Sequence, residues 1–295
     1  MREVTVEMVD AFVDGEAGGN AAGIVFDDAA GLSPAERQEV ARQIAVSETA
    51  FVLRSANGNF KLEFHTPTRP IPHCGHATVG TFARLAALGR LNDRELINET
   101  VDGPRRIRVD GERAFMEQVP AKLTGLDDAT AGEVLASLGI GTMQLRPDGG
   151  PFLGDNGNRS LQIGVADAAV LRSLEPNMEA IRDITNRFDA VCYYVFAAES
   201  VVPGRDATAR MFGPAYGIPE ESATGMAAGP LACWLDARAG GRREAFAIEQ
   251  GQMMNPTSPS LIIARPQRPA AGAALSAMWI GGSARASGVR RIRIE

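Results

Sequence analysis

The chain has 295 residues, of which 45% are hydrophobic and 22% are charged, and its formal net charge is −6. This length is enough for about two domains of ordinary size, so the chain can bury a substantial core. The composition is that of a globular protein and excludes a disordered or collagen-like chain. The acidic balance argues against a nucleic-acid partner, because affinity for phosphate comes from clustered lysine and arginine.

The apolar segments are short, and the cysteines are few. The longest apolar run, around residues 45–53, is interrupted by polar side chains and falls well short of the roughly 20 residues that span a bilayer. The N-terminus alternates apolar and polar residues like a strand and unlike a signal peptide. The three cysteines, Cys74, Cys192 and Cys233, fit a reducing compartment better than a disulfide framework. We therefore expect a cytoplasmic protein with no membrane partner.

In the first 118 residues, local signals predict a strand-rich region with two helices. Ser33 is a natural N-cap, Pro34 suits the first helical position, and Glu36 completes a capping box. Asn-Gly and Asp-Gly pairs between apolar runs predict hairpin turns. The expected elements are strands at 4–10 and 22–26, a helix at 34–45, strands at 50–54 and 60–65 joined at Asn57-Gly58, a helix from His76 to about residue 88, and a hairpin at Asp110-Gly111.

Beyond Pro120 a similar order of elements recurs. We expect a helix at 129–138 that ends at Gly139, a loop at 148–158, strands at 161–165 and 190–196, and helices within 167–187. The segment Phe64-x-x-Pro67, Ile71-Pro72, Ala77-Thr78 resembles Phe212-x-Pro214, Ile218-Pro219, Ala223-Thr224, and each precedes or opens a helical run. This recurrence indicates an internal duplication.

Two related halves would face each other across a cleft, where ligand pockets often form. We expect an N-terminal lobe at 1–118 and a C-terminal lobe at 119–279, with a strand near 280–295 as a candidate to return to the N-terminal lobe. Helix N-termini expose unpaired backbone N–H groups, so the turns at Gly75-His76-Ala77 and Thr224-Gly225 are candidates to hold a substrate carboxylate.

Glu48 is the first candidate for chemistry, because it lies among small and apolar residues. Burial disfavours the charged form of a carboxylate and suits it to general acid/base work. The structural alternative is a glutamate at a helix exit that points to solvent.

The three histidines, His65, His73 and His76, lie close in sequence to Cys74. Such a cluster permits a zinc site, but no second Cys or His group completes four ligands, and strand residues 73 and 74 would point to opposite faces. A nucleophilic pair of Cys74 and His76 is a further alternative. We favour neither, and predict no metal site.

Glu220 and Glu221 precede the second predicted helix N-terminus. They either complement the helix dipole or take part in the chemistry opposite His76. No glycine-rich dinucleotide motif after a strand and no P-loop is present, so we expect an enzyme without a cofactor.

Taken together, these residues resemble the PhzF family of phenazine-biosynthesis-like isomerases. The resemblance spans nearly the whole chain in the family's order. The matching segments are Asp10-Ala11-Phe12 with Gly19-Asn20, Ser47-Glu48-Thr49-Ala50-Phe51, Thr66-Pro67-Thr68, Cys74-Gly75-His76-Ala77-Thr78, Glu220 to Gly225, Glu249-Gln250-Gly251 and Gly281-Gly282-Ser283.

The resemblance implies an α/β fold like that of diaminopimelate epimerase, with two pseudo-symmetric lobes, each a strand-rich barrel around a central helix. It also implies a cofactor-free isomerase that forms a homodimer. By position, Glu48 matches the family's proton-shuttling glutamate, His76 matches its histidine, and Glu221 takes the place of its aspartate. The implied substrate-binding residues are Asn20, Cys74, Gly75, Ala77, Thr224, Gly225 and Met226.

The sequence departs from the family pattern around the second helix. Glu221-Ser222 replaces Asp-Pro, Met226 replaces a small serine, and Arg69-Pro70 replaces a segment that usually carries a glutamate. We therefore do not assign the substrate of the family to this chain.

We accordingly predict an isomerase of a small carboxylate-bearing metabolite, in which Glu48, His76 and Glu221 transfer or relay protons. The alternatives are an epimerase or racemase that uses Glu48 or Cys74 with Glu221, and a catalytically silent small-molecule binder.

Overall fold

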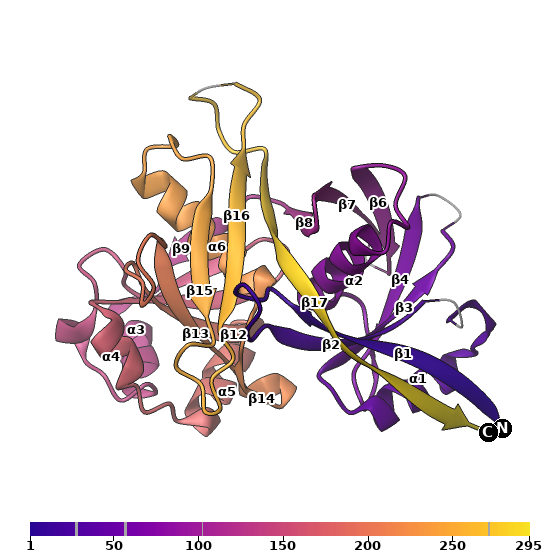
Figure 1. The fold of residues 1–295 in the computed structure, drawn as a ribbon. Helices are drawn as coiled ribbons and strands as arrows, with labels where there is room; N and C mark the ends of the chain where they lie inside the picture. Colours follow the sequence, from indigo (N-terminus) through magenta and orange to yellow (C-terminus); the bar gives the residue numbers. More distant parts are fainter. Residues whose placement is uncertain (27–28, 56–57, 102, 271) are drawn as a thin grey trace. The chain divides into compact units, whose positions relative to one another are not determined.

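The computed structural model describes residues 1–26, 29–55, 58–101, 103–270 and 272–295. Within these residues the chain forms strands and helices in mixed order (Figure 1). The elements of the first part are β1 (Arg2–Ala11), β2 (Asn20–Val25), α1 (Pro34–Ile44), β3 (Glu48–Leu53), β4 (Phe60–His65), β5 (Pro70–Ile71), α2 (Gly75–Ala87), β6 (Glu95–Thr100), β7 (Gly103–Asp110) and β8 (Arg113–Gln118).

The second part begins with a short strand and ends on a long strand. Its elements are β9 (Lys122–Gly125), α3 (Asp128–Ala136), β10 (Phe152–Asp155), β11 (Arg159–Val165), α4 (Ala168–Arg172), α5 (Met178–Arg187), β12 (Ala190–Ala197), β13 (Ala207–Gly213), β14 (Ile218–Glu221), α6 (Gly225–Arg238), β15 (Phe246–Gln250), β16 (Ser260–Gln267) and β17 (Ala277–Ile294). None of the helices in the described part of the chain is both long enough and apolar enough to span a bilayer.

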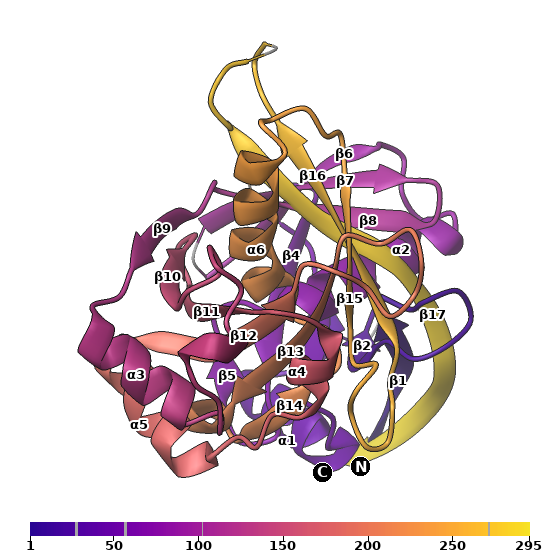
Figure 2. The ribbon, with the colours of Figure 1, turned by 90° about the vertical axis from the view of Figure 1, so that its left-hand side faces the viewer.

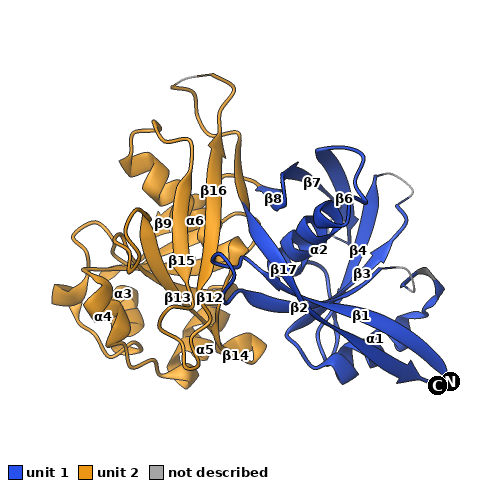
Figure 3. Ribbon diagram, viewed as in Figure 1, with its two compact units in different colours: residues 1–117, 281–295 blue, residues 118–280 orange. Residues whose placement is uncertain are grey.

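The chain divides into two compact units (Figure 3). Unit 1 comprises Met1–Glu117 and Gly281–Glu295, and unit 2 comprises Gln118–Ile280. The C-terminal strand β17 therefore returns to unit 1, where it runs antiparallel to β1.

Unit 1 is a closed barrel of eight strands. Antiparallel and parallel pairings connect β1 to β2, β2 to β3, β3 to β4, β4 to β6, β6 to β7 and β7 to β8. Strand β17 pairs with both β8 and β1 and closes the ring. Closure leaves no exposed sheet edge among these strands.

Helix α2 packs against β1, β2, β3 and β7 and is the central helix of this barrel. Its sequence explains the position, because small residues such as Gly75, Ala77 and Gly80 let the strands approach closely, and nearly all of its side chains are buried. A Cβ at Gly80 would already lie 3.3 Å from Ala11 Cβ. The opposite side of β3 packs with α1, whose capping box at Ser33 and Glu36 is formed as predicted.

Unit 2 repeats the same pairing sequence. Strands β10 and β11 are antiparallel, β11 and β12 parallel, β12 and β13 antiparallel, β13 and β15 parallel, and β15 and β16 antiparallel. This order of orientations matches that of β1, β2, β3, β4, β6 and β7. Helix α6 packs against β10, β11, β12, β15 and β16 (Figure 2) and is the counterpart of α2. The expected fold of two pseudo-symmetric lobes with central helices is confirmed.

Two details of the sequence-based prediction are wrong or incomplete, and a third lies partly outside the described residues. The expected loop at 148–158 contains β10, which pairs on both sides with β9 and β11. The glycines of this segment favoured a loop in the prediction, because glycine is uncommon in strands. Gly154 is required in β10 because a Cβ at this position would lie 2.5 Å from Pro230 Cβ in α6. Strand β6 was not expected at all. The hairpin turn predicted at Asn57-Gly58 lies partly outside the described residues.

The local alignment of the two halves also needs correction. Ala77 and Thr78 lie inside α2, whereas Ala223 and Thr224 precede α6. The structural equivalence is instead between Gly75 and Gly225, which are the first residues of the two central helices.

Candidate active site

Glu48 lies at the start of β3, where the chain leaves α1. Helix α1 ends in a left-handed residue, Ala45, with φ of 56°, which turns the chain into the strand. Strand β3 pairs with β2 in parallel so that Glu48 is opposite Ala22. The residue is only 8% exposed, so the alternative of a solvent-directed glutamate is wrong. Its Oε2 atom is buried and has no hydrogen-bond partner among the described residues.

His76 is the second residue of α2 and faces Glu48. Its Nε2 atom lies 3.3 Å from Glu48 Oε2 and 3.5 Å from Ser47 Oγ. Its Nδ1 atom lies 3.5 Å from Cys74 Sγ. The imidazole is 5% exposed and bridges a carboxylate on one edge and a thiol on the other. Ser47 belongs to the motif recognised in the sequence, but its contact with His76 was not anticipated.

Cys74 is the N-cap residue of α2, and its side chain makes no capping hydrogen bond. Gly75, His76 and Ala77 form the first turn, where backbone N–H groups have no carbonyl partner four residues earlier in the helix. These N–H groups and the helix dipole favour an anion at this end of the helix. The first turn of α2 thus combines anion-binding groups with His76 and Cys74.

Asn20 is the first residue of β2 and is 8% exposed. It lies two residues before Ala22, the residue opposite Glu48. Side chains two residues apart point to the same face of a sheet, so Asn20 and Glu48 share a face of the barrel. Unit 1 therefore brings together Glu48, Cys74 and His76, and it places Asn20 on the same face of the sheet as Glu48.

The other two histidines lie elsewhere. His65 is paired with Thr49, on the opposite face of β3 from Glu48, and its Nδ1 atom lies 3.0 Å from Gln38 Oε1. Burial lowers the pKa of His65. His73 packs edge-on against the Phe64 ring, and burial lowers its pKa to about 4. Of the Cys and His residues considered from the sequence, Cys74 and His76 therefore stay together, whereas His65 and His73 do not belong to their group.

Glu220 and Glu221 in unit 2 have different hydrogen-bond partners. Two guanidinium nitrogens of Arg210, Nε and Nη2, donate to Glu220 at 2.9 Å, so Glu220 is held in an ion pair. Glu221 is the last residue of β14, and its Oε2 atom accepts a hydrogen bond from Thr224 Oγ1. Glu221 remains the candidate for chemistry in this unit.

Gln250 holds the turn that carries Glu221, and the sequence analysis did not single it out. Its Oε1 atom accepts from Tyr194 OH at 2.9 Å and from Thr224 N at 3.0 Å. Its Nε2 atom donates to Glu221 O at 2.7 Å and to Thr224 Oγ1 at 3.1 Å. The amide is fully buried, and all four bonds brace the N-terminus of α6. The only sequence signal was its place in the Glu-Gln-Gly segment.

Met226 is partly buried in the first turn of α6. Its Sδ atom accepts from Gln118 Nε2 at 3.4 Å, and its carbonyl accepts from Asn156 Nδ2 at 3.0 Å. The second bond replaces one that the helix cannot make, because residue 230, four positions later, is a proline without an N–H group. The carbonyl of Gly225 likewise accepts from Gln118 Nε2, at 3.1 Å.

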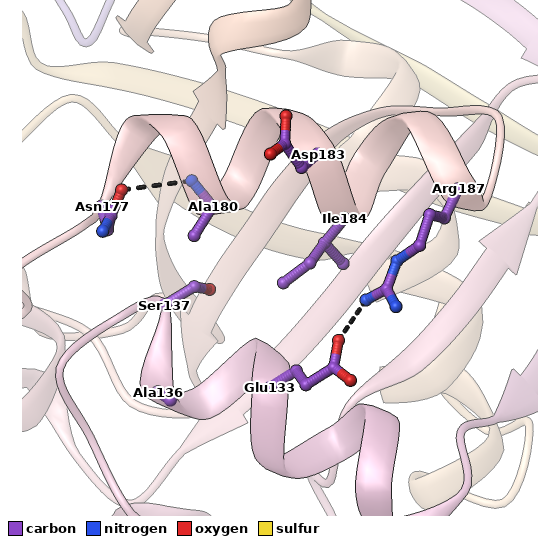
Figure 4. A pocket seen from close by; sticks show the side chains of 8 residues that line it. All are labelled: Glu133, Ala136, Ser137, Asn177, Ala180, Asp183, Ile184 and Arg187. Atoms are coloured by element: carbon purple, nitrogen blue, oxygen red, sulfur yellow. Dashed lines mark hydrogen bonds and ion pairs between the residues drawn. The ribbon is translucent and has the colours of Figure 1, made fainter.

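A pocket in unit 2 lies apart from all of these residues, between α3 and α5 (Figure 4). An ion pair between Arg187 and Glu133 crosses it. It is lined by Glu133, Ala136, Ser137, Asn177, Ala180, Asp183, Ile184 and Arg187. None of the residues predicted for the site lines this pocket.

Known proteins are similar to this chain over most of its length. The family model described as phenazine biosynthesis-like protein matches residues 9–278. The chain is 33% identical over 266 residues to trans-2,3-dihydro-3-hydroxyanthranilate isomerase of Pseudomonas chlororaphis, covering 88% of this chain and 89% of that protein. It is 32% identical over 234 residues to a protein of Escherichia coli K12 named as an uncharacterized isomerase, YddE, covering 77% of each chain.

Solved structures share the fold. A phenazine biosynthesis protein of the PhzF family from Bacillus anthracis has a TM-score of 0.88 at 24% identity and covers the whole of both chains. A hydroxyproline epimerase from Agrobacterium vitis has a TM-score of 0.62 at 12% identity, covering 99% of this chain and 92% of that one. The chain therefore belongs to the phenazine biosynthesis-like (PhzC-PhzF) family and is an enzyme of the isomerase class that its curated relatives represent.

Proposed function

We propose that this isomerase moves a proton between two positions of a small carboxylate-bearing metabolite, with Glu48 as the acid/base and without a cofactor. The observation that carries the proposal is the buried Glu48 Oε2 atom, 3.3 Å from His76 Nε2. A buried carboxylate has fewer water molecules to displace before it can accept a proton from carbon. Glu48 would remove a proton from an activated carbon and return one elsewhere.

His76 is placed to govern the protonation of Glu48. Its Nε2 atom is close enough to donate to the carboxylate or to a polar group of the substrate, and its other ring nitrogen faces Cys74 Sγ. In unit 2, Glu221 would relay protons to the substrate, with its carboxylate oriented by Thr224.

The substrate carboxylate would bind at the helix N-termini. The N–H groups of Gly75, His76 and Ala77 at α2, and those at Thr224 and Gly225 of α6, can stabilise negative charge that develops on the substrate. In this proposal Asn20, Cys74 and Met226 line the bound molecule. Met226 contributes a thioether rather than a hydroxyl, which favours an apolar group beside it.

The names of the relatives suggest which substrates to try first. The Pseudomonas relatives are named for trans-2,3-dihydro-3-hydroxyanthranilate, a partly reduced ring carboxylate. We propose that this chain accepts an unsaturated carboxylate of similar size. A screen of that compound and of other small carboxylic and amino acids for hydrogen exchange in heavy water requires no assumption about the product.

The decisive variant is Glu48→Gln, which keeps the shape of the side chain but cannot accept a proton from carbon. We expect turnover of a confirmed substrate to fall by about 10² to 10⁴ or more, with ligand binding retained. Glu112→Gln is the matched control, because Glu112 is exposed in the turn between β7 and β8. Unchanged turnover in Glu48→Gln would refute the assignment of the base. Binding without turnover in the wild type as well would indicate a silent binder.

An epimerase is the second candidate, and the position of Cys74 favours testing it. Its thiol lies 3.5 Å from His76 Nδ1, so the imidazole could take the thiol proton and leave a thiolate base. An epimerase exchanges the proton at one stereocentre, whereas an isomerase moves unsaturation and changes the ultraviolet spectrum. Loss of exchange in Cys74→Ser without a spectral change in the wild type would favour the epimerase. The homodimer and the cytoplasmic location stay predictions.

A further inference from the structure

Glu48, Cys74 and His76 are also a set of metal-ligand types. One carboxylate oxygen, one sulfur and one imidazole nitrogen lie within 4.8 Å of one another, and all three residues are buried. Zinc is commonly bound by these three kinds of atom. A catalytic-type zinc site needs three protein ligands and leaves a fourth position for water or another small molecule.

The spacing is close to that of a tetrahedral site. Zinc bonds of about 2.0 to 2.3 Å place neighbouring ligand atoms about 3.3 to 3.6 Å apart. Glu48 Oε2 and His76 Nε2 already lie at 3.3 Å. Cys74 Sγ faces the other ring nitrogen at 3.5 Å. One sulfur, one carboxylate oxygen and one ring nitrogen still lie within 4.8 Å of one another, so the thiol has to move closer to the Glu48 side of the ring when the ion binds.

A second observation points to a cation. Glu48 Oε2 is buried, and its contact with His76 Nε2, at 3.3 Å, does not have the geometry of a hydrogen bond. A buried carboxylate oxygen is costly unless a positive or donating group meets it well. The N-terminal dipole of α2 opposes a cation. Two anionic ligands, a carboxylate and a thiolate, would outweigh that partial charge and neutralise a divalent ion.

We propose that this site binds one Zn²⁺ ion, and that the bound ion inhibits the enzyme. Binding converts the Cys74 thiol to a zinc-bound thiolate and releases one proton to solvent. The thiolate and imidazole favour zinc over magnesium or calcium, which prefer oxygen ligands. Inhibition rests on the proposed function, because the ion would occupy the carboxylate oxygen that accepts the substrate proton. Binding itself does not depend on that function.

The test uses the 295-residue chain, freed of metal by chelation and titrated with Zn²⁺ against a chromogenic chelator. We expect one ion per chain with micromolar or tighter affinity, and weaker binding by more than about tenfold in Cys74→Ser. Cys233→Ser is the matched control, because this thiol lies in α6 and accepts a hydrogen bond from Ala121 N that a serine can also accept. Circular dichroism checks that each variant is folded.

Cobalt provides a readout that needs no variant. Co²⁺ bound at the same site should give a thiolate-to-metal charge-transfer band and the visible spectrum of a tetrahedral ion, and Zn²⁺ should displace it. Binding that is equally tight in Cys74→Ser and the wild type, or Co²⁺ without a thiolate band, would overturn the site. Full turnover in Glu48→Gln, beside Zn²⁺ binding by the wild type that Cys74→Ser weakens, would refute the proposed function and leave the metal site standing.

Discussion

Replacing His73 by phenylalanine should make unit 1 more resistant to acid. Both ring nitrogens of His73 are buried and have no hydrogen-bond partner in the described structure. The Phe64 ring packs edge-on at a centroid distance of 6.0 Å. Burial first, and the nearby charge of Arg105 second, lower the pKa of His73 to about 4. The site therefore holds a neutral imidazole and has no group ready to stabilise the charged form.

The size of the effect follows from proton linkage. An unfolded histidine has a pKa of about 6.5, so between that value and about 4 the unfolded chain binds more protons than the folded chain at this residue. Stability is therefore lost as the pH falls through this window and is unaffected above it. The loss attributable to His73 is about 2 kcal/mol at pH 5 and approaches about 3 kcal/mol near pH 4.

The assay compares urea unfolding of the wild type and His73→Phe between pH 7.5 and pH 4. The difference in unfolding free energy should be small at the upper end and should grow in favour of the variant as the pH falls. The chain has only three histidines, so their ring protons can be assigned by single substitutions in NMR titrations. His73 should titrate near pH 4. A normal titration of His73 near 6.5, or parallel stability curves for the two proteins, would refute this reasoning.

Two further predictions concern the first turn of α6. Asn156→Ala should lower the free energy of unfolding by about 1 to 3 kcal/mol, because the Met226 carbonyl loses its side-chain donor. The loss should be smaller in a Pro230→Ala background, where the helix regains an N–H group for that carbonyl, and equal losses in both backgrounds would contradict the account. Gln250→Met should cost about 2 kcal/mol or more, because buried partners such as Tyr194 OH are left unpaired. Thermal unfolding measures this, and an unchanged midpoint would show that the four bonds do not brace the turn.

Elements whose signals lie within a few residues could be predicted from the sequence. The capping box of Ser33 and Glu36 and the turn at Asp110-Gly111 depend on contacts between residues at most four apart, and both are present. The family motifs directed attention to Glu48 and His76 because they preserve residue types at fixed spacing, and the structure brings these two side chains together.

Other features depend on distant segments, so tertiary structure alone decided them. Strand β10 contains only four residues and became a strand because β9 and β11 supply hydrogen bonds on both sides. Gln250 reaches its turn from 26 residues away, and Asn156 completes a helix 70 residues later in the chain. The local sequence specifies how a helix or turn begins, whereas burial and hydrogen-bond partners at long range exist only after the barrel strands have paired.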